Sequence, residues 1–550
     1  MKKPSEIKAK IVLNKTPYTF SDEIVTDSFS AVIKTDGDRV TLALEPKGEL
    51  SFDEISLIMP AQAGSDERIF MNGYQSWTDS REYHPDEKQR GLHGIPAPIV
   101  RKYNFDKYGD YNFADYPNRS GELHGFTYCY FRTGQGFLLI GSLSERQGFT
   151  EFRFSSRKKR LTVSLECEGA SYSEPFNALD LFITEGSENE VFDHYFDMMH
   201  IPSPKGKPIT GYTSWYRHYQ DISEKKLMHD LDSLSRTKGQ DIFQIDDGYQ
   251  CAVGDWLDIN KLTFPDGLEK LSSAIHEKGL KAGLWLAPFV CEKQSEIYKN
   301  KKHWLLHDKE GNEVPAGCNW SGSFALDIYN EEVRAYLKEV FDTVLNKWGF
   351  DLVKLDFLYA ACIIPQNGRS RGQVMCEAMD FLRECVGSKL ILGCGVPLGA
   401  AFGKVEYCRI GCDVGLDYND NPVMQMTHRE RVSTKNSMLN TVFRRQLDGR
   451  AFYNDPDVFL LRDDNISLFN AQKQSLAFIN HIFGSVYFTS DDVASYGEWQ
   501  KKTLATANRL KAAAVRSVTY DRVEISISIT DGASEKQFVL FPDGKLGSKK

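Results

Sequence analysis

The stretch that decides the fold is Val353-Lys354-Leu355-Asp356-Phe357, in which apolar and charged residues alternate. In an extended strand, side chains two positions apart share a face, so Lys354 and Asp356 point one way and the apolar residues point the other. A Lys and an Asp on the inward face predict an ion pair, and the cation favours the ionised carboxylate, as a nucleophile requires. A purely structural salt bridge inside a barrel is the alternative.

Similar short apolar segments lie on both sides of this stretch and alternate with amphipathic helical patterns. Eight strands that alternate with helices predict a (β/α)8 TIM barrel, with a doubly wound open sheet as the competing architecture. No G-x-G-x-x-G fingerprint follows the first strand, which disfavours the open sheet. The predicted strands are residues 209–215, 241–247, 281–289, 351–357, 389–395, 407–413, 451–457 and 485–491. The predicted helices are residues 223–236, 267–278, 330–347 and 372–386.

Two of the connections are irregular. Residues 395–407 leave little room for a full crossover helix, so we expect a shortened unit there. The long connection over 289–351 carries a hairpin-like insertion around residues 308–315.

The flanking parts of the chain have a different pattern from the barrel. Residues 1–200 contain short alternating segments separated by Gly, Asp, Asn and Pro, which predicts an N-terminal β-sandwich domain. A Pro-rich linker opens the barrel, which we assign to residues 201–514. Alternation returns over residues 515–550 and predicts a small C-terminal β domain, whose last four residues we expect to be frayed.

The composition excludes several classes of protein. The 550 residues carry a net charge of −9, from 67 basic and 76 acidic residues, which argues against a nucleic-acid or anionic-membrane partner. The 11 Cys are odd in number and form no C-x-x-C, so reduced thiols and a cytoplasmic location are expected.

The start has no signal-like apolar region, and no apolar run approaches the roughly 18 residues of a membrane span. The 12 His form no metal-binding motif, so no metal and no cofactor are predicted. The sequence leaves the oligomeric state open, a homo-oligomer included.

Carboxylates gather at the predicted strand ends, where barrel enzymes carry their chemistry. Each acid taken singly has an alternative role as the cap of the following helix. Asp246 and Asp247 are adjacent, and strand twist could bring both to one ligand with vicinal hydroxyls. Trp285 is either core filling or a platform for a sugar ring, and Trp77 alone is best explained as domain core or interface. The acids are Asp246, Asp247, Asp356, Asp413, Asp455, Asp457, Asp491 and Asp492.

No G-x-S-x-G and no P-loop occurs in the sequence. Carboxylates and Trp in one cleft, without metal or phosphate motifs, point toward glycoside hydrolysis. At the sixth strand, Arg409, Gly411 and Asp413 share a face, and the glycine leaves room for a ligand.

These segments together resemble the melibiase-type α-galactosidases of glycoside hydrolase family 36, as a shorter bacterial-type member, and the resemblance covers most of the chain. The motifs occur in the family's order. They are Asn72-Gly73-Tyr74-Gln75-Ser76-Trp77, Phe243-Gln244-Ile245-Asp246-Asp247-Gly248-Tyr249, Gly283-Leu284-Trp285-Leu286-Ala287-Pro288-Phe289, Lys354-Leu355-Asp356-Phe357, Ile391-Leu392-Gly393-Cys394-Gly395, Arg409-Ile410-Gly411-Cys412-Asp413 and Asn454-Asp455-Pro456-Asp457.

The resemblance implies a retaining, exo-acting α-galactosidase that cleaves melibiose- or raffinose-type substrates by double displacement. It implies that Asp356 is the nucleophile and Asp413 the acid/base. Residues that it implies to contact the sugar are Asp246, Asp247, Trp285, Lys354, Cys394, Arg409, Trp77 and Trp215.

The sequence departs from the family pattern in two places. Its first strand reads Gly211-Tyr212-Thr213-Ser214-Trp215, where Gly-Trp-Cys-Ser-Trp is expected, and Val414-Gly415-Leu416-Asp417-Tyr418 replaces the usual Pro/Trp-rich continuation after the acid. The second departure puts the aglycone preference in question. An α-N-acetylgalactosaminidase, a transglycosylase and, less readily, a non-catalytic sugar-binding protein are the alternatives.

Overall fold

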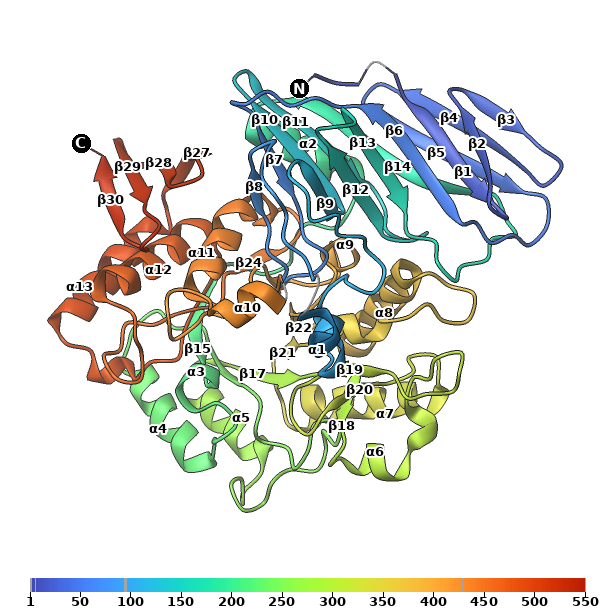
Figure 1. Ribbon diagram of the computed structural model, residues 1–550. Helices are drawn as coiled ribbons and strands as arrows, with labels where there is room; N and C mark the ends of the chain where they lie inside the picture. Colours follow the sequence, from blue (N-terminus) through green and yellow to red (C-terminus); the bar gives the residue numbers. More distant parts are fainter. Residues whose placement is uncertain (1, 5, 93–95, 428, 550) are drawn as a thin grey trace.

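A parallel sheet curls into the barrel that the sequence predicts (Figure 1). The computed structural model describes residues 2–4, 6–92, 96–427 and 429–549. All eight predicted strands are present. They are β15 (Ile209–Thr213), β16 (Ile242–Ile245), β17 (Lys281–Leu286), β21 (Leu352–Leu355), β22 (Leu390–Gly393), β23 (Tyr407–Arg409), β24 (Tyr453–Asp455) with β25 (Val458–Phe459), and β26 (Val486–Thr489).

The barrel is closed by its seventh strand, which is split in two. β24 pairs with β23 and β25 pairs with β26, all in parallel, while β26 also pairs with β15. The split falls at Pro456, which has no backbone N–H for a ladder hydrogen bond, and at Asp457, whose φ is 74°. The interruption therefore turns the Asp457 side chain out of the strand pattern at the end of the barrel where chemistry is expected.

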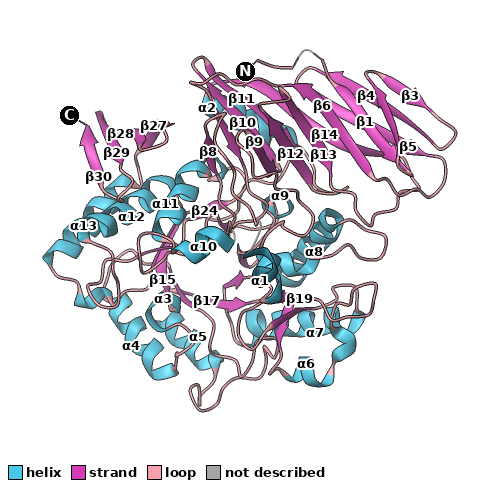
Figure 2. Ribbon diagram, viewed as in Figure 1, coloured by secondary structure: helices cyan, strands magenta, loops and turns pink. Residues whose placement is uncertain are grey.

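Amphipathic helices cover the outside of the barrel (Figure 2). The predicted helices form α4 (Glu224–Ser235), α5 (Leu268–Glu277), α7 (Glu331–Asp342) with a π-helical extension (Thr343–Lys347), and α8 (Arg371–Val386). Ser223, Asn330 and Ser370 cap α4, α7 and α8 with their side chains. Later helices are α11 (Thr434–Phe443), α12 (Asn470–Phe483) and α13 (Glu498–Leu510).

Both predicted irregularities are confirmed. The shortened unit contains only the four-residue α9 (Leu398–Ala401). Around residues 308–315 the chain turns back on itself, with an antiparallel bridge between His307 and Glu313. The same insertion also forms a three-stranded sheet of β18 (Val290–Glu292), β20 (Ser323–Ala325) and β19 (Pro315–Gly317), in that order.

The N-terminal part is a sandwich of two antiparallel sheets around its own apolar core. One sheet has the order β2 (Thr16–Phe20), β1 (Lys8–Leu13), β6 (Glu54–Pro60), β13 (Arg160–Leu165), β12 (Thr150–Ser155), β9 (Glu122–Phe126). The other has the order β3 (Glu23–Val25), β4 (Phe29–Asp36), β5 (Arg39–Pro46), β14 (Phe176–Gly186), β11 (Gly136–Ser142), β10 (Tyr128–Thr133), β7 (Arg68–Met71), β8 (Arg81–Tyr83). α2 (Glu188–Met199) leads from the sandwich toward the barrel.

A four-stranded antiparallel sheet ends the chain: β27 (Ala514–Tyr520), β28 (Ile525–Asp531), β29 (Ser534–Leu540) and β30 (Leu546–Lys549). The expectation of a frayed tail was wrong, because residues 546–549 pair with β29. The fold class is confirmed, whereas the proposed domain limits at 200/201 and 514/515 stay predictions. Within the described residues, no helix is long and apolar enough to span a membrane.

Buried guanidinium groups fasten the sandwich to the barrel, and among the described residues Arg444 makes the densest set of these bonds. Arg444, at the end of α11, is 0% exposed and donates five hydrogen bonds. Its acceptors are Asn72 Oδ1 (3.0 Å), Gly73 O (3.2 Å), Gln75 O (3.1 Å), Ser76 O (2.6 Å) and Ile410 O (2.9 Å). Four of these belong to the loop between β7 and β8, so four of the five N–H groups of the guanidinium hold the loop that carries Trp77, and the fifth binds the barrel at Ile410.

Replacing this side chain should destabilise the protein strongly. We expect Arg444→Ala to lower the free energy of unfolding by about 3 kcal/mol or more, because buried carbonyl groups lose their donors. Arg444→Lys should recover only part of the loss, because an ammonium has three donors. Urea unfolding measures both.

Arg146 provides the matched control. It also joins the N-terminal part to the barrel, through Asp380, but its side chain is 52% exposed. Arg146→Ala should cost less than about 1 kcal/mol. Equal losses at the two sites would contradict the role given to Arg444.

Candidate active site

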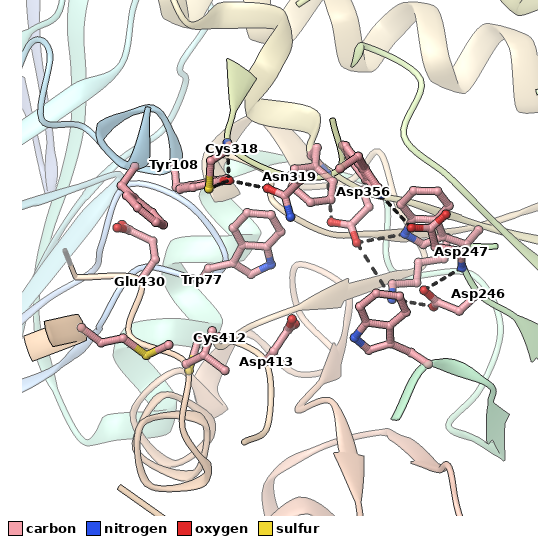
Figure 3. Close-up of a pocket in the computed structure, with 18 residues that line it drawn as sticks. Trp77, Tyr108, Asp246, Asp247, Cys318, Asn319, Asp356, Cys412, Asp413 and Glu430 are labelled. Atoms are coloured by element: carbon pink, nitrogen blue, oxygen red, sulfur yellow. Dashed lines mark hydrogen bonds and ion pairs between the residues drawn. The ribbon is translucent and has the colours of Figure 1, made fainter. Parts of the chain in front are cut away.

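A pocket of about 290 Å³ opens at the carboxyl ends of the barrel strands. Its walls come from the barrel, from the insertion after β17, from the loop after β23 and from the sandwich loop that Arg444 holds. Figure 3 shows Asp246, Asp247 and Asp356 at one end, Tyr108, Glu430 and Cys412 at the other, and Trp77 and Asp413 between them. The lining residues are Trp77, Phe105, Tyr108, Trp215, Asp246, Asp247, Trp285, Cys318, Asn319, Trp320, Lys354, Asp356, Phe357, Cys412, Asp413, Met424, Glu430 and Val432.

Asp356 follows β21 directly and is held by three neighbours. Its Oδ2 accepts a hydrogen bond from the Trp285 indole at 3.1 Å and lies 4.0 Å from the Lys354 ammonium. Its Oδ1 accepts from the Phe357 backbone N–H at 2.9 Å, and Phe357 has a φ of 53°. These contacts fix the carboxylate while its side chain keeps 11% of its surface exposed.

The closest partner of Lys354 is Asp246, not Asp356. Lys354 Nζ lies 2.9 Å from Asp246 Oδ2, and the same oxygen accepts from Gln244 Nε2 at 2.9 Å. Burial raises the pKa of Asp246, but the Lys354 cation and the hydrogen bonds from Gln244 and the Asp247 N–H together outweigh burial and leave the pKa below its ordinary value. Burial lowers the pKa of Lys354, yet Asp246 and Asp356 together raise it overall. The Lys354 ammonium thus contacts both acids, and the expected ion pair with Asp356, at 4.0 Å, is longer than the one with Asp246, at 2.9 Å.

Asp247 points to the same pocket from the opposite side of its strand. Its Oδ2 accepts from the Trp320 indole at 2.9 Å and from Gln220 Nε2 at 2.8 Å, and Gln250 donates to Oδ1 at 2.5 Å. Burial raises its pKa. The two adjacent acids therefore both line one cavity, as the sequence suggested, from the loop just beyond β16.

Asp413 is the most solvent-exposed of the acids described in this pocket. It lies four residues beyond Arg409, the last residue of β23, and 43% of its side chain is exposed. Arg409 Nη1 donates to Asp413 Oδ1 at 2.7 Å, and the same guanidinium binds Asp457 at 2.8 Å and Asp455 at 3.4 Å. Burial raises the pKa of Asp457 to about 7, with Arg409 opposing the shift and Asp413 and Asp455 adding to it. One cation therefore links a pocket acid to two buried acids behind it.

Eight of the ten predicted site residues line the pocket. Cys394 and Arg409 do not: each lies buried behind a lining residue. The Trp77 indole donates to Cys394 Sγ at 3.2 Å, while Arg409 binds Asp413 as described. Contacts of these ten residues with a sugar stay predictions.

Part of the pocket wall comes from segments that connect strands, and the sequence did not predict these residues. Trp320, Cys318 and Asn319 lie in the long insertion, and Phe105 and Tyr108 lie in a connection inside the sandwich. The only signal was the length of the insertion, because long connections at this end of a barrel are where binding residues gather. Met424, Glu430 and Val432 follow the departure at 414–418 and had no family motif to mark them.

No group of three or more His, Cys, Asp or Glu in the described part of the chain has the geometry of a metal site. The site offers two carboxyl groups in different surroundings, with aromatic side chains in the pocket wall. Asp356 is shielded and fixed in orientation, whereas Asp413 is accessible to solvent and lies beside the Arg409 cation. Two carboxyl groups in such a cleft are the functional groups of a glycoside hydrolase.

Comparison with known proteins confirms the resemblance to family 36. The family model described as Melibiase matches residues 198–376, which include the first four barrel strands. α-Galactosidase Mel36A of Lactobacillus acidophilus is 30% identical over 152 residues, which are 26% of this chain and 20% of that protein. α-Galactosidase AgaA of Geobacillus stearothermophilus is 30% identical over 254 residues, which are 43% of this chain and 32% of that protein. The matched stretches thus span a fifth to a third of these curated relatives.

A solved structure matches over nearly the whole chain. The α-galactosidase TtGalA from Thermus thermophilus, in complex with p-nitrophenyl α-D-galactopyranoside, superposes with a TM-score of 0.72 at 25% identity. The match covers 95% of this chain and 98% of that one. The structure of AgaA, at 12% identity and a TM-score of 0.60, supports the fold alone.

Removing the Lys354 cation, which lies between Asp246 and Asp356, should destabilise the protein. We expect Lys354→Met to lower the free energy of unfolding at pH 7 by about 3–5 kcal/mol, because Asp246 becomes an unpaired buried charge. The loss should shrink as the pH falls from 7 toward 4, since Asp246 then takes up a proton. Denaturant unfolding across this pH range measures the effect.

Lys389 is the control for this substitution. It lies just before β22, at the opposite end of the barrel, where it is 3.5 Å from Asp351 and 38% exposed. Lys389→Met should cost less than about 1 kcal/mol at every pH. A Lys354→Met loss that does not change with pH would refute the ion-pair explanation.

Proposed function

We propose that this chain is a retaining, exo-acting α-galactosidase. Asp356 attacks the anomeric carbon of a terminal α-galactoside while Asp413 gives a proton to the leaving oxygen. A covalent galactosyl–Asp356 ester forms, and Asp413 then takes a proton from the water that attacks it, which regenerates both carboxyl groups. Binding of galactosides by relatives, stachyose in TtGalA and raffinose in an AgaA variant, supports this substrate class.

The observation that carries the proposal is the different setting of the two acids. Asp356 is shielded, oriented by the Trp285 indole and the Phe357 N–H, and near the Lys354 cation, which suits a carboxylate that must be ionised. Asp413 is exposed to solvent and lies between the two ends of the pocket (Figure 3). A group that hands a proton to the leaving oxygen and later activates water needs that position.

The inner end of the pocket suits a single sugar ring. Asp246 and Asp247 offer neighbouring carboxylate oxygens to vicinal hydroxyls, and Trp285 and Trp320 form adjacent walls with ring centroids 6.2 Å apart. A sugar can place its C–H face against such rings and its hydroxyls against the acids. This arrangement supports removal of one terminal residue at a time.

An α-N-acetylgalactosaminide is the second substrate to test. The A type blood α-D-galactosamine galactosaminidase of Flavonifractor plautii is 30% identical over 150 residues of this chain. Assays with p-nitrophenyl α-galactoside and with p-nitrophenyl α-N-acetylgalactosaminide decide between the two sugars. NMR of the first-formed anomer of the released sugar tests the retaining mechanism. Release of α-galactose first supports the proposal, β-galactose first refutes the retaining mechanism, and no turnover by folded protein indicates a sugar-binding protein.

Asp413→Ala should affect substrates according to their leaving groups. We expect kcat/KM for melibiose to fall about a thousandfold or more, and that for p-nitrophenyl α-galactoside far less, because nitrophenolate leaves without a proton. Asp356→Ala is the comparison variant and should abolish turnover of both substrates. Equal losses on the two substrates in Asp413→Ala would contradict its role as the acid.

Asp457→Asn should shift one side of the pH profile. Burial raises the pKa of Asp457 to about 7, so Asp457 carries its negative charge beside Arg409 only on the alkaline side of the profile, and the substitution removes that charge. Loss of negative charge near the proton donor makes the donor easier to deprotonate, so the alkaline limb of the kcat/KM profile should move to lower pH. The acid limb should stay in place and serves as the internal control; a shift of the alkaline limb toward higher pH would contradict this linkage.

A further inference from the structure

The outer end of the pocket, beyond Asp413, differs in chemistry from the inner end. Three of its walls are apolar or aromatic: Phe105, Met424 and Val432. They come from the connection before Tyr108 and from the segment after the departure at 414–418. Figure 3 places Tyr108 and Glu430 at this end, away from Asp246, Asp247 and Asp356. A leaving group attached to a galactose at the inner end would extend in this direction.

The polar groups at the outer end are occupied by one another. The Tyr108 hydroxyl donates to Asn319 Oδ1 and accepts from the Cys318 backbone N–H at 2.8 Å. Glu430 accepts from Thr78 Oγ1 and from the Tyr111 hydroxyl, each at 3.0 Å. The side chains of Phe105, Met424 and Val432 offer no hydrogen-bond partner to the hydroxyls of a second sugar, whereas an apolar group in contact with them leaves no hydroxyl unsatisfied.

The two segments that carry Phe105 and Met424 also bear exposed apolar side chains. α1 (Pro96–Lys102) packs against α10 (Pro422–Thr427), and both carry exposed apolar side chains. Ile99 is 55% and Tyr103 is 53% exposed on or beside α1, and Val423 is 62% and Met426 is 56% exposed on α10. We define these four residues as the rim. Met424 and Phe105 belong to the same two segments and connect the rim with the interior of the pocket.

We propose that the natural substrate class is α-galactosides with an apolar aglycone, an alkyl or aryl chain, in place of a second sugar. The inference rests on the proposed α-galactosidase function and names the leaving group of that same site. The chain would lie over Phe105, Met424 and Val432 and leave the pocket across the rim. The rim is an exposed apolar surface, and contact with the aglycone would remove this surface from water, which is favourable.

Alkyl α-galactosides of increasing length test the inference. Methyl, butyl and hexyl α-D-galactopyranosides release alcohols of similar basicity, so the chemical step is held constant while the apolar area grows. Full burial of each methylene corresponds to about a fourfold gain, so kcat/KM should rise at least about tenfold from the methyl to the hexyl substrate. Melibiose should be turned over less efficiently than the hexyl substrate.

The double variant Val423→Ser/Met426→Ser assigns the gain to the rim. Its ratio of kcat/KM for hexyl over methyl substrate should fall at least about threefold below that of the wild type, and the ratio cancels any general loss of activity. Val25→Ser is the matched control, because Val25 is 71% exposed on the edge strand β3, in the sandwich. Its ratio should equal that of the wild type.

The outcomes separate the two proposals. Turnover of the methyl substrate with no gain for longer chains overturns the apolar aglycone and leaves the α-galactosidase intact. A higher kcat/KM for melibiose than for the hexyl substrate does the same. An unchanged ratio in the double variant refutes the rim as the binding surface. No turnover of any of the four substrates overturns the proposed function, and the inference with it.

Discussion

The five hydrogen bonds of Arg444 are the constraint on which the rest of the site depends. The guanidinium binds the Asn72 side-chain oxygen and the backbone carbonyl groups of Gly73, Gln75 and Ser76, and in doing so it holds the loop of residues 72–77 against the barrel. The Trp77 indole then reaches Cys394, behind the pocket wall. A sandwich that is far from the carboxylates in sequence thereby supplies one wall of their cavity.

The barrel could be predicted because its signals are local. Each strand is a short apolar run, and each of the four predicted helices has its own period and, in three cases, a capping side chain. The carboxylates at the strand ends could be placed for the same reason. The choice of partners could not: Lys354 was expected beside Asp356, two residues away, yet its shorter contact is with Asp246 on another strand. Sequence spacing fixes which side chains share a face, whereas contacts across strands depend on twist and on the position of a long flexible side chain.

The outer half of the pocket was beyond prediction for a related reason. Its walls come from connections whose shape is set by tertiary contacts, such as those of Tyr108 with Cys318 and Asn319 across the pocket. The departure from the family pattern at 414–418 was visible, but it indicated only that the leaving-group side differs. The same division holds for the two ends of the pocket: the inner end carries the motifs that resemble those of family 36, and Phe105, Met424 and Val432 at the outer end lie outside these motifs.

The position of Arg444 in the chain also has a consequence for biosynthesis. During translation the sandwich is complete long before Arg444 is made, about 370 residues after its carbonyl partners. Until then the loop that bears Trp77 has only its contacts within the N-terminal part, such as that of Gln75 with the Tyr108 carbonyl. The barrel closes only when β26 pairs with β15 and β25, so the complete pocket wall requires nearly the whole chain.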